Sequence, residues 1–325
     1  MEHWGKIFMR ILLTGSNGQL GTEFRTISRS TAEVISTGSR ELDLTNEQEI
    51  RRFVREVKPA IIVNAAAFSD VDAAERNWDA CFALNAIAPV VLAEEAHRLD
   101  ALLIHYSTDQ VFDGNKSAPY SESDPTSPLN VYGASKLAGE QGIAASFARS
   151  LILRLGWIYG AQGENFLRSI LRLAEHSDEL HVASDQIGAP TSTRAIAAAT
   201  ERLIRMYANC RKAQFPTGIY HLAASGATSW HGFAVAIVSA AFQGRKAPLV
   251  TPTMTPELSS FAKRPKNLLL SNQKFLKTFG IQLGPWQQQL DEVLAEMRAD
   301  AILAGNGIGE RGRGVRHLIG IDEVC

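Results

Sequence analysis

Residues 10–21, RILLTGSNGQLG, pass from an apolar run into a turn that holds three glycines. The run predicts a strand over Arg10–Thr14, and the residues after Gly18 predict the start of a helix. Glycines at 15, 18 and 21 permit a tight turn, close approach of the backbone to a phosphate and tight helix packing, while free N–H groups at the helix start attract an anion. This predicts a phosphate-binding turn, with an ordinary strand-to-helix turn as the alternative. Its candidate contacts are Gly15, Asn17, Gly18, Gln19, Leu20 and Gly21.

Short β-branched runs alternate with amphipathic stretches through the first half of the chain. Further strands are expected over 33–37, 60–64, 102–107 and 151–155. Strands separated by helix-length segments indicate βαβ units and a parallel sheet that is covered on both faces. The predicted fold is therefore α/β, a Rossmann-type doubly wound parallel sheet with a smaller C-terminal domain.

Two of the intervening helices carry recognisable end signals. Thr45 and Gln48 have capping-box spacing, apolar residues then repeat at helical spacing, and Pro59 ends that helix. A second helix is expected to start near Pro89.

The alternation weakens beyond about Gly160, which suggests a second domain. We expect residues 9–160 to form the nucleotide-binding domain, with a segment around 190–222 returning to it. Residues 161–300 would mainly form the smaller domain, and residues 301–325, rich in Gly and Arg, are expected to pack poorly.

Composition narrows the class of protein. The 325 residues are 45% hydrophobic and 21% charged, which fits a globular chain with a real core. A net charge of −1 does not suggest a nucleic-acid scaffold. The apolar runs are too short to span a bilayer, and the three cysteines show no CxxC spacing. We expect a cytoplasmic protein without nucleic-acid or membrane partners.

Residues after the second and third predicted strands suit a dinucleotide. Asp43 and Leu44 lie about two dozen residues beyond the glycine turn, where an acidic residue can meet a ribose. Arg40 offers a guanidinium to the 2′-phosphate of NADP, or is a solvated loop arginine. Ala65, Ala66 and Ala67 leave room for a ribose against the backbone. The expected cofactor is NADPH or NADH.

Tyr132 and Lys136 are four residues apart, so on a helix their side chains share a face. A nearby ammonium stabilises phenolate, and the pair can donate a proton to a carbonyl oxygen that accepts hydride. Thr108, at the exit of the fourth predicted strand, can hydrogen-bond the same oxygen.

The chain resembles the extended short-chain dehydrogenase/reductases that act on sugar nucleotides, and among them the dTDP-4-dehydrorhamnose reductases. The resemblance runs from about residue 9 to 298. It rests on the phrases GSNGQLGTE at 15, VNAAAFSDVDAAE at 63, HYSTDQVFDG at 105, SPLNVYGASKLAGE at 127, LRLGWIYG at 153, DQIGAPT at 185 and GIYHLAASGATSWHGFA at 218. It implies reduction of the C4 keto group of dTDP-4-dehydro-6-deoxy-L-mannose with NADPH or NADH, in nucleotide-sugar and cell-surface polysaccharide biosynthesis.

By this resemblance Tyr132 is the proton donor, Lys136 binds the nicotinamide ribose and tunes Tyr132, and Thr108 completes the triad. The second domain would hold the nucleotide sugar, with Trp157 against the sugar or nicotinamide and Arg264 near the diphosphate. The implied substrate contacts are Thr108, Asp109, Val111, Tyr132, Trp157, Asn165, Phe166 and Arg264.

The chain departs from the family pattern at one metal position. Some members are described as dimers bridged by magnesium on glutamates; Glu23 fits one such position, but Arg194 stands where another glutamate would be needed. A magnesium site is therefore not expected, and a homodimer stays open. The histidines, His105 among them, are interpreted as packing or surface residues because their spacing does not match a metal site.

Four other functions stay open. A different sugar-nucleotide reductase or an epimerase shares the same triad. A dehydratase usually adds an acidic pair, whereas Asp109 is followed here by Gln110. A non-catalytic regulatory subunit of the methionine adenosyltransferase type is the alternative outside the enzymes.

Overall fold

The computed structural model describes residues 9–28, 32–255, 261–303 and 315–318. Six parallel strands form the central sheet in the order β10-β5-β4-β3-β1-β2. Their bounds are β1 Arg10–Thr14, β2 Glu33–Thr37, β3 Ile61–Asn64, β4 Leu102–Thr108, β5 Ser150–Leu155 and β10 Gly218–His221. The α/β fold class with a parallel sheet is confirmed, and the five expected strands lie within one residue of their predicted bounds.

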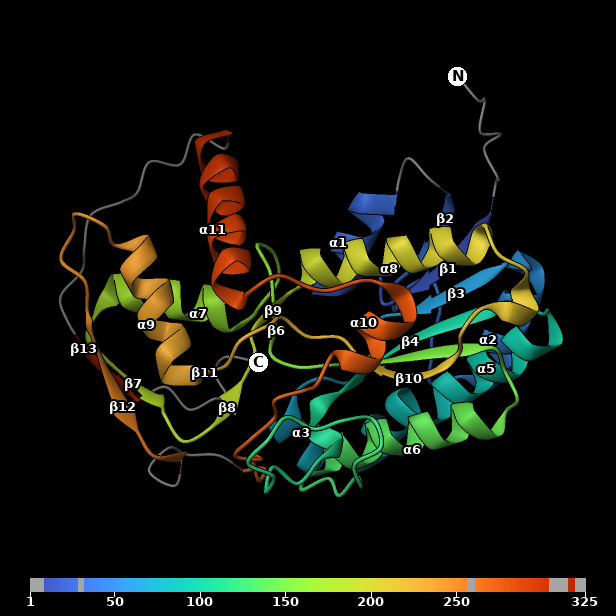
Figure 1. Ribbon diagram of the computed structural model, residues 1–325, viewed down its shortest axis with the longest axis horizontal. Coiled ribbons are helices and arrows are strands. Elements are labelled where there is room, and N and C mark those ends of the chain that lie inside the picture. Colours follow the sequence, from blue (N-terminus) through green and yellow to red (C-terminus); the bar gives the residue numbers. More distant parts are fainter. Residues whose placement is uncertain (1–8, 29–31, 256–260, 304–314, 319–325) are drawn as a thin grey trace.

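Helices cover both faces of this sheet (Figure 1). One face carries α1 Gln19–Ser28 and α8 Thr193–Ala208, and the other carries α2 Glu47–Val57, α5 Ala88–Arg98 and α6 Val131–Ala145. Strands that are buried on both faces read as apolar runs, as β1 and β3 do. Their alternate side chains enter two separate hydrophobic clusters, with Ile11 and Leu13 on one side and Leu12 and Ile62 on the other.

The second lobe packs helices against a smaller parallel sheet, at the left of Figure 1. Its helices are α7 Phe166–His176, α9 Trp230–Ala241 and α11 Trp286–Leu303, and its sheet has the order β12-β7-β13, with β7 Ser177–Ala183, β12 Leu249–Thr253 and β13 Val315–Leu318. β13 lies in the region expected to pack poorly and pairs in parallel with β7. The remainder of that region beyond residue 303 lies outside the described residues.

Shorter elements connect the two lobes and the sheet. They are α3 Val71–Arg76, α4 Trp78–Phe82, a π-helical turn Ala83–Ile87, 3₁₀ turns Asp109–Val111 and Lys212–Gln214, α10 Gln273–Phe279, and the strand pairs β6 Ile158–Tyr159 with β9 Thr191–Ser192 and β8 Ile187–Gly188 with β11 Thr228–Ser229.

The expected capping box of α2 is wrong. The helix begins one residue later, and the Asn46 side chain accepts hydrogen bonds from the N–H groups of Gln48 and Glu49. The Thr45 hydroxyl instead donates to Asp43 at 2.7 Å. Asn is at least as good an N-cap as Thr, so the sequence did not distinguish Thr45 from its neighbour Asn46. The helix ends as expected before Pro59, at Lys58 in the left-handed conformation.

Candidate active site

A pocket of about 270 Å³ opens between the two lobes at the carboxyl ends of the central strands. In a doubly wound sheet, ligands bind at the carboxyl ends of the strands, at the point where the strand order reverses. Here that point lies beside β1, whose neighbours are β2 and β3. Fourteen sequence-predicted site residues line the pocket: Gly18, Gln19, Leu20, Ala65, Ala66, Ala67, Thr108, Asp109, Tyr132, Lys136, Trp157, Asn165, Phe166 and Arg264.

The three glycines of the turn, Gly15, Gly18 and Gly21, have different surroundings. Gly15 has a φ of +71°, and a Cβ there would lie 2.4 Å from the nitrogen of Ala66. A Cβ on Gly21 would lie 2.1 Å from the Gly15 oxygen, so α1 needs glycine to approach β1. At Gly18 the nearest atom is at an ordinary 3.4 Å, and of the three only Gly18 lines the pocket. The fold therefore demands the outer two glycines, while the middle one faces ligand space.

The residues expected to meet the adenosine end lie outside the pocket lining. Arg40 is exposed after β2. Asp43 is exposed and accepts from Thr45, and this hydrogen bond lowers the pKa of Asp43. The Leu44 side chain is buried in the hydrophobic cluster below α2. Glu41, which the sequence interpretation overlooked, turns back to accept from Gly38 N–H at 2.7 Å, placing a carboxylate at this end of the site.

Helix α6 brings Tyr132 and Lys136 to the pocket. The Asn130 side chain caps the helix by accepting from Gly133 N–H at 2.8 Å. A Cβ on Gly133 would lie 2.3 Å from the Gln110 oxygen, so the missing side chain lets α6 approach the turn after β4. Tyr132 and Lys136 of α6 line the pocket, as does Thr108 at the end of β4.

Lys136 is fully buried and makes two contacts through its amine. Nζ donates to the Tyr106 carbonyl at 2.6 Å and lies 3.2 Å from His105 Nε2. Burial lowers the pKa of Lys136 to about 8, against the opposite effects of Glu140 and Cys81. Glu140 itself is held by Arg154 at 2.6 Å and by the Ser107 hydroxyl at 2.5 Å.

Asp109 is a buried carboxyl that lines the same pocket. Its Oδ1 accepts from the Thr108 hydroxyl at 3.2 Å, while its Oδ2 has no hydrogen-bond partner. Burial raises the pKa of Asp109 to about 8, so the group is largely a neutral acid at pH 7. Glycine at 156 is required beside it, because a Cβ there would lie 2.1 Å from Oδ2.

Aromatic side chains also line the pocket. Trp157 stacks on Trp230 with ring centroids 3.6 Å apart, and Phe166 lies 4.5 Å from Trp230. Trp157 holds a φ of +48°, which is uncommon for a bulky residue and typical of functional sites. Trp157 is half-buried and lines the pocket.

Three expected substrate contacts are already engaged by the protein. Asn165 caps α7 and donates to the Gly160 carbonyl at 3.0 Å. Arg264 is buried and paired with Asp72, whose other oxygen accepts from Ala262 N–H at 2.6 Å. Val111 is fully buried in a cluster with Phe112 and is absent from the pocket lining, because the 3₁₀ turn directs it inward.

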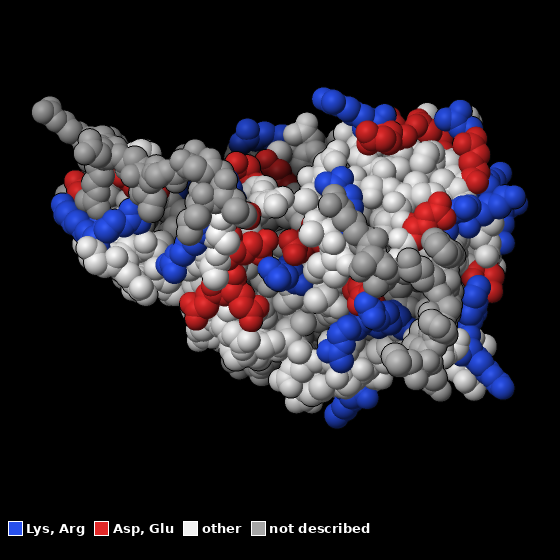
Figure 2. Space-filling view, turned by 90° about the horizontal axis from the view of Figure 1, so that it is seen from above, with Lys and Arg blue, Asp and Glu red and all other residues white. Residues whose placement is uncertain are grey.

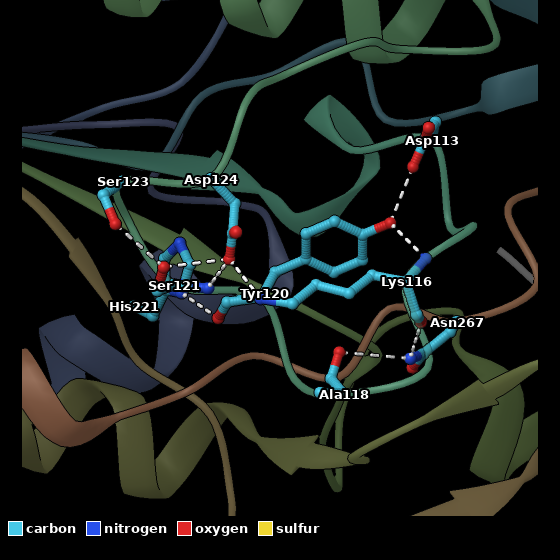
Figure 3. A network of polar contacts seen from close by, with 9 residues as sticks. All are labelled: Asp113, Lys116, Ala118, Tyr120, Ser121, Ser123, Asp124, His221 and Asn267. Carbon is cyan, nitrogen blue, oxygen red and sulfur yellow. Dashed lines mark hydrogen bonds and ion pairs between the residues drawn. The ribbon is translucent and has the colours of Figure 1, made fainter.

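A network of polar side chains, the loop network, fixes the segment between β4 and α6 (Figure 3). The Tyr120 hydroxyl donates to Asp113 at 2.6 Å, and Lys116 pairs with Asp124 at 2.6 Å. His221 Nδ1 lies 3.1 Å from the Tyr120 carbonyl, and Asn267 donates to the Lys116 carbonyl at 2.5 Å. These contacts tie the loop to β10 and to the segment after Arg264.

The sequence interpretation gave no site role to two buried polar residues, Asn85 and His105. Asn85, in the π-helical turn, donates to Ser135 Oγ at 3.0 Å and accepts from Phe68 N–H at 2.9 Å. Asn64 contacts His105, which in turn contacts Lys136. A polar residue inside an apolar strand was the available signal, and His105 was instead interpreted as a packing residue. Trp230 was also missed as a pocket residue.

The position of the family's magnesium ligands does not fit a cation. Arg194 pairs with Glu296 at 2.9 Å, and the pKa of Glu23 is raised by burial and by Glu296 but lowered by Arg194. A fixed guanidinium among the two carboxylates supplies the positive charge itself. The described part of the chain holds no group of three or more metal-ligating side chains.

Surface charge is mixed. On the face shown in Figure 2, basic and acidic groups lie interspersed among neutral residues, with no continuous basic surface among the described residues. Within the described residues, each helix is either too short or too polar to traverse a membrane.

Comparison with known proteins identifies a family and similar structures for this chain. Residues 9–299 match the family model of the RmlD substrate binding domain. A dTDP-4-dehydrorhamnose reductase of Burkholderia thailandensis is 43% identical over 286 residues, 86% of this chain and 96% of the relative. Crystal structures of a dTDP-4-dehydrorhamnose reductase from Clostridium acetobutylicum and of one from Bacillus anthracis in complex with NADP both align with a TM-score of 0.82. They are 36% and 32% identical, and each alignment covers 89% of this chain and 100% of the other.

Proposed function

Because the chain belongs to the RmlD substrate binding domain family, we propose that it reduces the C4 keto group of dTDP-4-dehydro-6-deoxy-L-mannose to give dTDP-L-rhamnose. The observation that carries this proposal is that Thr108, Tyr132 and Lys136 all line the pocket between the lobes. Relatives named dTDP-4-dehydrorhamnose reductase match most of the chain. This is an NAD(P)H-dependent oxidoreductase activity.

The reaction adds a hydride to C4 and a proton to its oxygen. Reduced nicotinamide, when bound, supplies the hydride. The Tyr132 hydroxyl donates the proton, and its O–H bond breaks as the new O–H bond on the sugar forms. Thr108 is 5% exposed and lines the same pocket, and its hydroxyl can donate to that oxygen in place of Asp109 Oδ1. Together they stabilise the charge that develops on the oxygen as hydride arrives.

The residues present fit a dinucleotide on the β1 side of the pocket. Gly18 leaves space that no side chain fills, and Ala65, Ala66 and Ala67 line the pocket beside it. Gln19 donates to the Glu164 carbonyl at 2.8 Å, which holds the turn against the second lobe. Arg40 is exposed and able to meet a 2′-phosphate, whereas Glu41 favours an unphosphorylated ribose. The opposed charges support use of both NADPH and NADH.

The second lobe is proposed to hold the nucleotide sugar. Stacked Trp157 and Trp230 offer a flat apolar surface to a deoxy sugar. Arg264 is held by Asp72 and lines the pocket, where it would contribute to binding a diphosphate. We assign residues 9–160 and 190–222 to the cofactor domain and the rest up to 300 mainly to the substrate domain. Both described cysteines are free, which supports a cytoplasmic setting.

The deciding experiment follows NADPH absorbance when the purified protein is mixed with dTDP-4-dehydro-6-deoxy-L-mannose, which the preceding pathway enzymes generate in the same reaction. We expect NADPH oxidation with formation of dTDP-L-rhamnose. Tyr132→Phe should lower kcat by about 10²- to 10⁴-fold, because general acid catalysis is lost. Tyr207→Phe, a buried tyrosine of α8 away from the pocket, is the matched control and should retain activity.

A folded protein that binds NADPH and leaves this keto sugar unreduced would overturn the substrate assignment. Turnover of a different nucleotide keto sugar would then identify another reductase of the same fold. Full activity of folded Tyr132→Phe would reject the role of Tyr132 as the proton donor.

A further inference from the structure

Residues 261–265, which we call the Arg264 segment, lie between β12 of the second lobe and α10, and bring Arg264 to the pocket. One carboxylate of the first lobe holds this segment. Asp72 Oδ1, on α3, accepts from Phe261 N–H at 2.8 Å and from Ala262 N–H at 2.6 Å. Its Oδ2 pairs with the Arg264 guanidinium. Both oxygens of Asp72 therefore contact one segment that lies 189 to 192 residues away in sequence.

The ion pair between Asp72 and Arg264 is buried. The Arg264 side chain is 5% exposed, and Asp72 is also buried. Each charge therefore depends on the other, because little water reaches either group to replace its partner. The place of the guanidinium in the pocket consequently follows the place of the Asp72 carboxylate.

Helix α3, which carries Asp72, is itself fixed to the first lobe. Glu75, three residues later, accepts at 2.8 Å from the N–H of Val131, the first residue of α6. The loop before α3 is held by Asn85, whose side chain accepts from Phe68 N–H at 2.9 Å and donates to the Phe68 carbonyl at 3.0 Å. Asp72 thus lies on a short helix that is held on both sides.

Two further contacts join the Arg264 segment to the first lobe. Asn130, the N-cap of α6, donates to the Lys263 carbonyl at 3.0 Å. Arg76, at the end of α3, lies with its Cζ 4.7 Å from the centre of the Phe261 ring. Asp72 differs from both of these residues because it contacts the backbone of the segment and also the side chain of Arg264.

We propose that Asp72 is a positioning residue that ties the Arg264 segment to α3 and holds the Arg264 guanidinium at one place in the pocket. The placement concerns the chain alone, while its effect on turnover rests on the proposed reductase function. In that function Arg264 contributes to binding a diphosphate, and a guanidinium already held in place spares the cost of ordering a long side chain when substrate binds. Asp72 is absent from the pocket lining, so it acts through Arg264.

An amide in place of the carboxylate separates the two contacts of Asp72. Asp72→Ala leaves a buried guanidinium without its partner and risks unfolding the chain. Asp72→Asn is nearly isosteric, and its amide oxygen still accepts from Phe261 and Ala262. Its amide nitrogen then faces the Arg264 guanidinium, and both groups can only donate. This variant keeps the backbone contacts and releases the arginine.

The first test is ¹⁵N NMR of the free protein with labelled arginine, in which loss of one signal in Arg264→Lys assigns the Nε–H of Arg264. We expect this proton to exchange with water about tenfold faster in Asp72→Asn than in the wild type, because the side chain leaves its buried site more often. An unchanged exchange rate in folded Asp72→Asn would overturn the proposal.

Asp79→Asn is the matched control. It makes the same chemical change at an exposed position on α4, the next helix along the chain. The Arg264 exchange rate and the kinetic constants of this variant should equal those of the wild type. A change as large as that of Asp72→Asn would assign the effect to net charge and would contradict a role for the contact.

The second test measures steady-state kinetics of Asp72→Asn. The KM for the nucleotide sugar should rise about tenfold, which corresponds to the loss of one charge-assisted contact. The kcat and the KM for NADPH should stay within about twofold of the wild type, since Asp72 acts on sugar-nucleotide binding. A lower KM for the sugar would mean that Asp72 competes with substrate for Arg264, and a fall in kcat alone would place the effect elsewhere. Either result would overturn the proposal.

A double variant shows whether Asp72 acts through Arg264. Arg264→Gln removes the guanidinium and should itself raise the KM for the nucleotide sugar. Adding Asp72→Asn to Arg264→Gln should raise that KM no further, because the arginine that Asp72 positions is already absent. Multiplied effects of the two changes would indicate independent roles and would contradict the proposal.

The NMR measurement uses neither substrate nor cofactor, so its outcome separates from that of the proposed function. Faster exchange in Asp72→Asn, with a protein that reduces no keto sugar, would leave the positioning role assigned and the reductase rejected. Rapid reduction by the wild type, with unchanged exchange in Asp72→Asn, would retain the reductase and reject the role of Asp72.

Discussion

Two polar networks lie on either side of the pocket, and each contains a buried histidine with its proton on a different nitrogen. The first, the lysine network, consists of four residues in contact, Thr14, Asn64, His105 and Lys136. In it, Ala66 N–H donates to Asn64 Oδ1, so Asn64 Nδ2 faces Nδ1 and can only donate to it, and the His105 proton lies on Nε2. In the loop network, the Tyr120 carbonyl can only accept, so the His221 proton lies on Nδ1. The tautomer of each buried histidine is therefore decided by one neighbouring group, which can only donate a hydrogen bond or only accept one.

The two networks also differ in where they place charge. The loop network keeps its ion pair, Lys116 with Asp124, partly exposed and holds a loop in place. The lysine network is fully buried and ends on a pocket residue. The loop network thus runs from the buried His221 to a partly exposed ion pair, whereas the other network stays buried up to the pocket residue Lys136.

The largest expected effect is a loss of kcat when Lys136 is replaced. Lys136→Met should lower kcat by about 10²- to 10⁴-fold, because the group beside Tyr132 is lost. The free energy of unfolding should change by less than about 2 kcal/mol, since an apolar side chain removes the cost of a buried amine but leaves the Tyr106 carbonyl without this donor. Steady-state assays and urea unfolding measure both. A large loss of stability with intact kcat would assign Lys136 to the fold alone.

The next effect concerns pH. Burial lowers the pKa of His221 to about 3, so between about pH 6.5 and 3 the unfolded chain binds a proton that the folded chain does not. The free energy of unfolding should therefore fall as pH drops through this range, and His221→Gln should flatten the slope by up to about 1.4 kcal/mol per pH unit. Urea unfolding at pH 7 and pH 5 checks this. His105 contributes with the same sign, so an unchanged slope in His221→Gln would leave the effect to the lysine network.

The smallest effect is on the loop network. Tyr120→Phe removes a hydroxyl that donates to Asp113 at 2.6 Å and accepts from Lys116 N–H at 3.1 Å. We expect a loss of about 1 kcal/mol of stability with unchanged kcat, because the hydroxyl lies away from the pocket. Thermal unfolding and the NADPH assay measure the pair. A fall in kcat with unchanged stability would erase the distinction between the networks.

Much of the fold was predictable from local patterns. Strand period, glycine spacing and helix ends located β1 to β5 and the strand–turn–helix at Gly15. Local patterns were less reliable where two neighbours offered similar chemistry, as at Thr45 and Asn46. Val111 and Leu44 were expected near ligands but point into hydrophobic clusters, because short motifs do not specify which side of a turn faces inward.

The sequence by itself determined the α/β architecture, the glycine-rich strand–turn–helix after β1 and the place of Tyr132 and Lys136 one turn apart on α6, since these depend on residues within one helical turn or one strand-to-helix connection. Tertiary structure alone decided that Asn64, His105 and Lys136, which lie far apart in sequence, form one row, and that Arg264 is held by Asp72. Proton positions followed from these contacts, because a buried imidazole takes the tautomer that its neighbours permit.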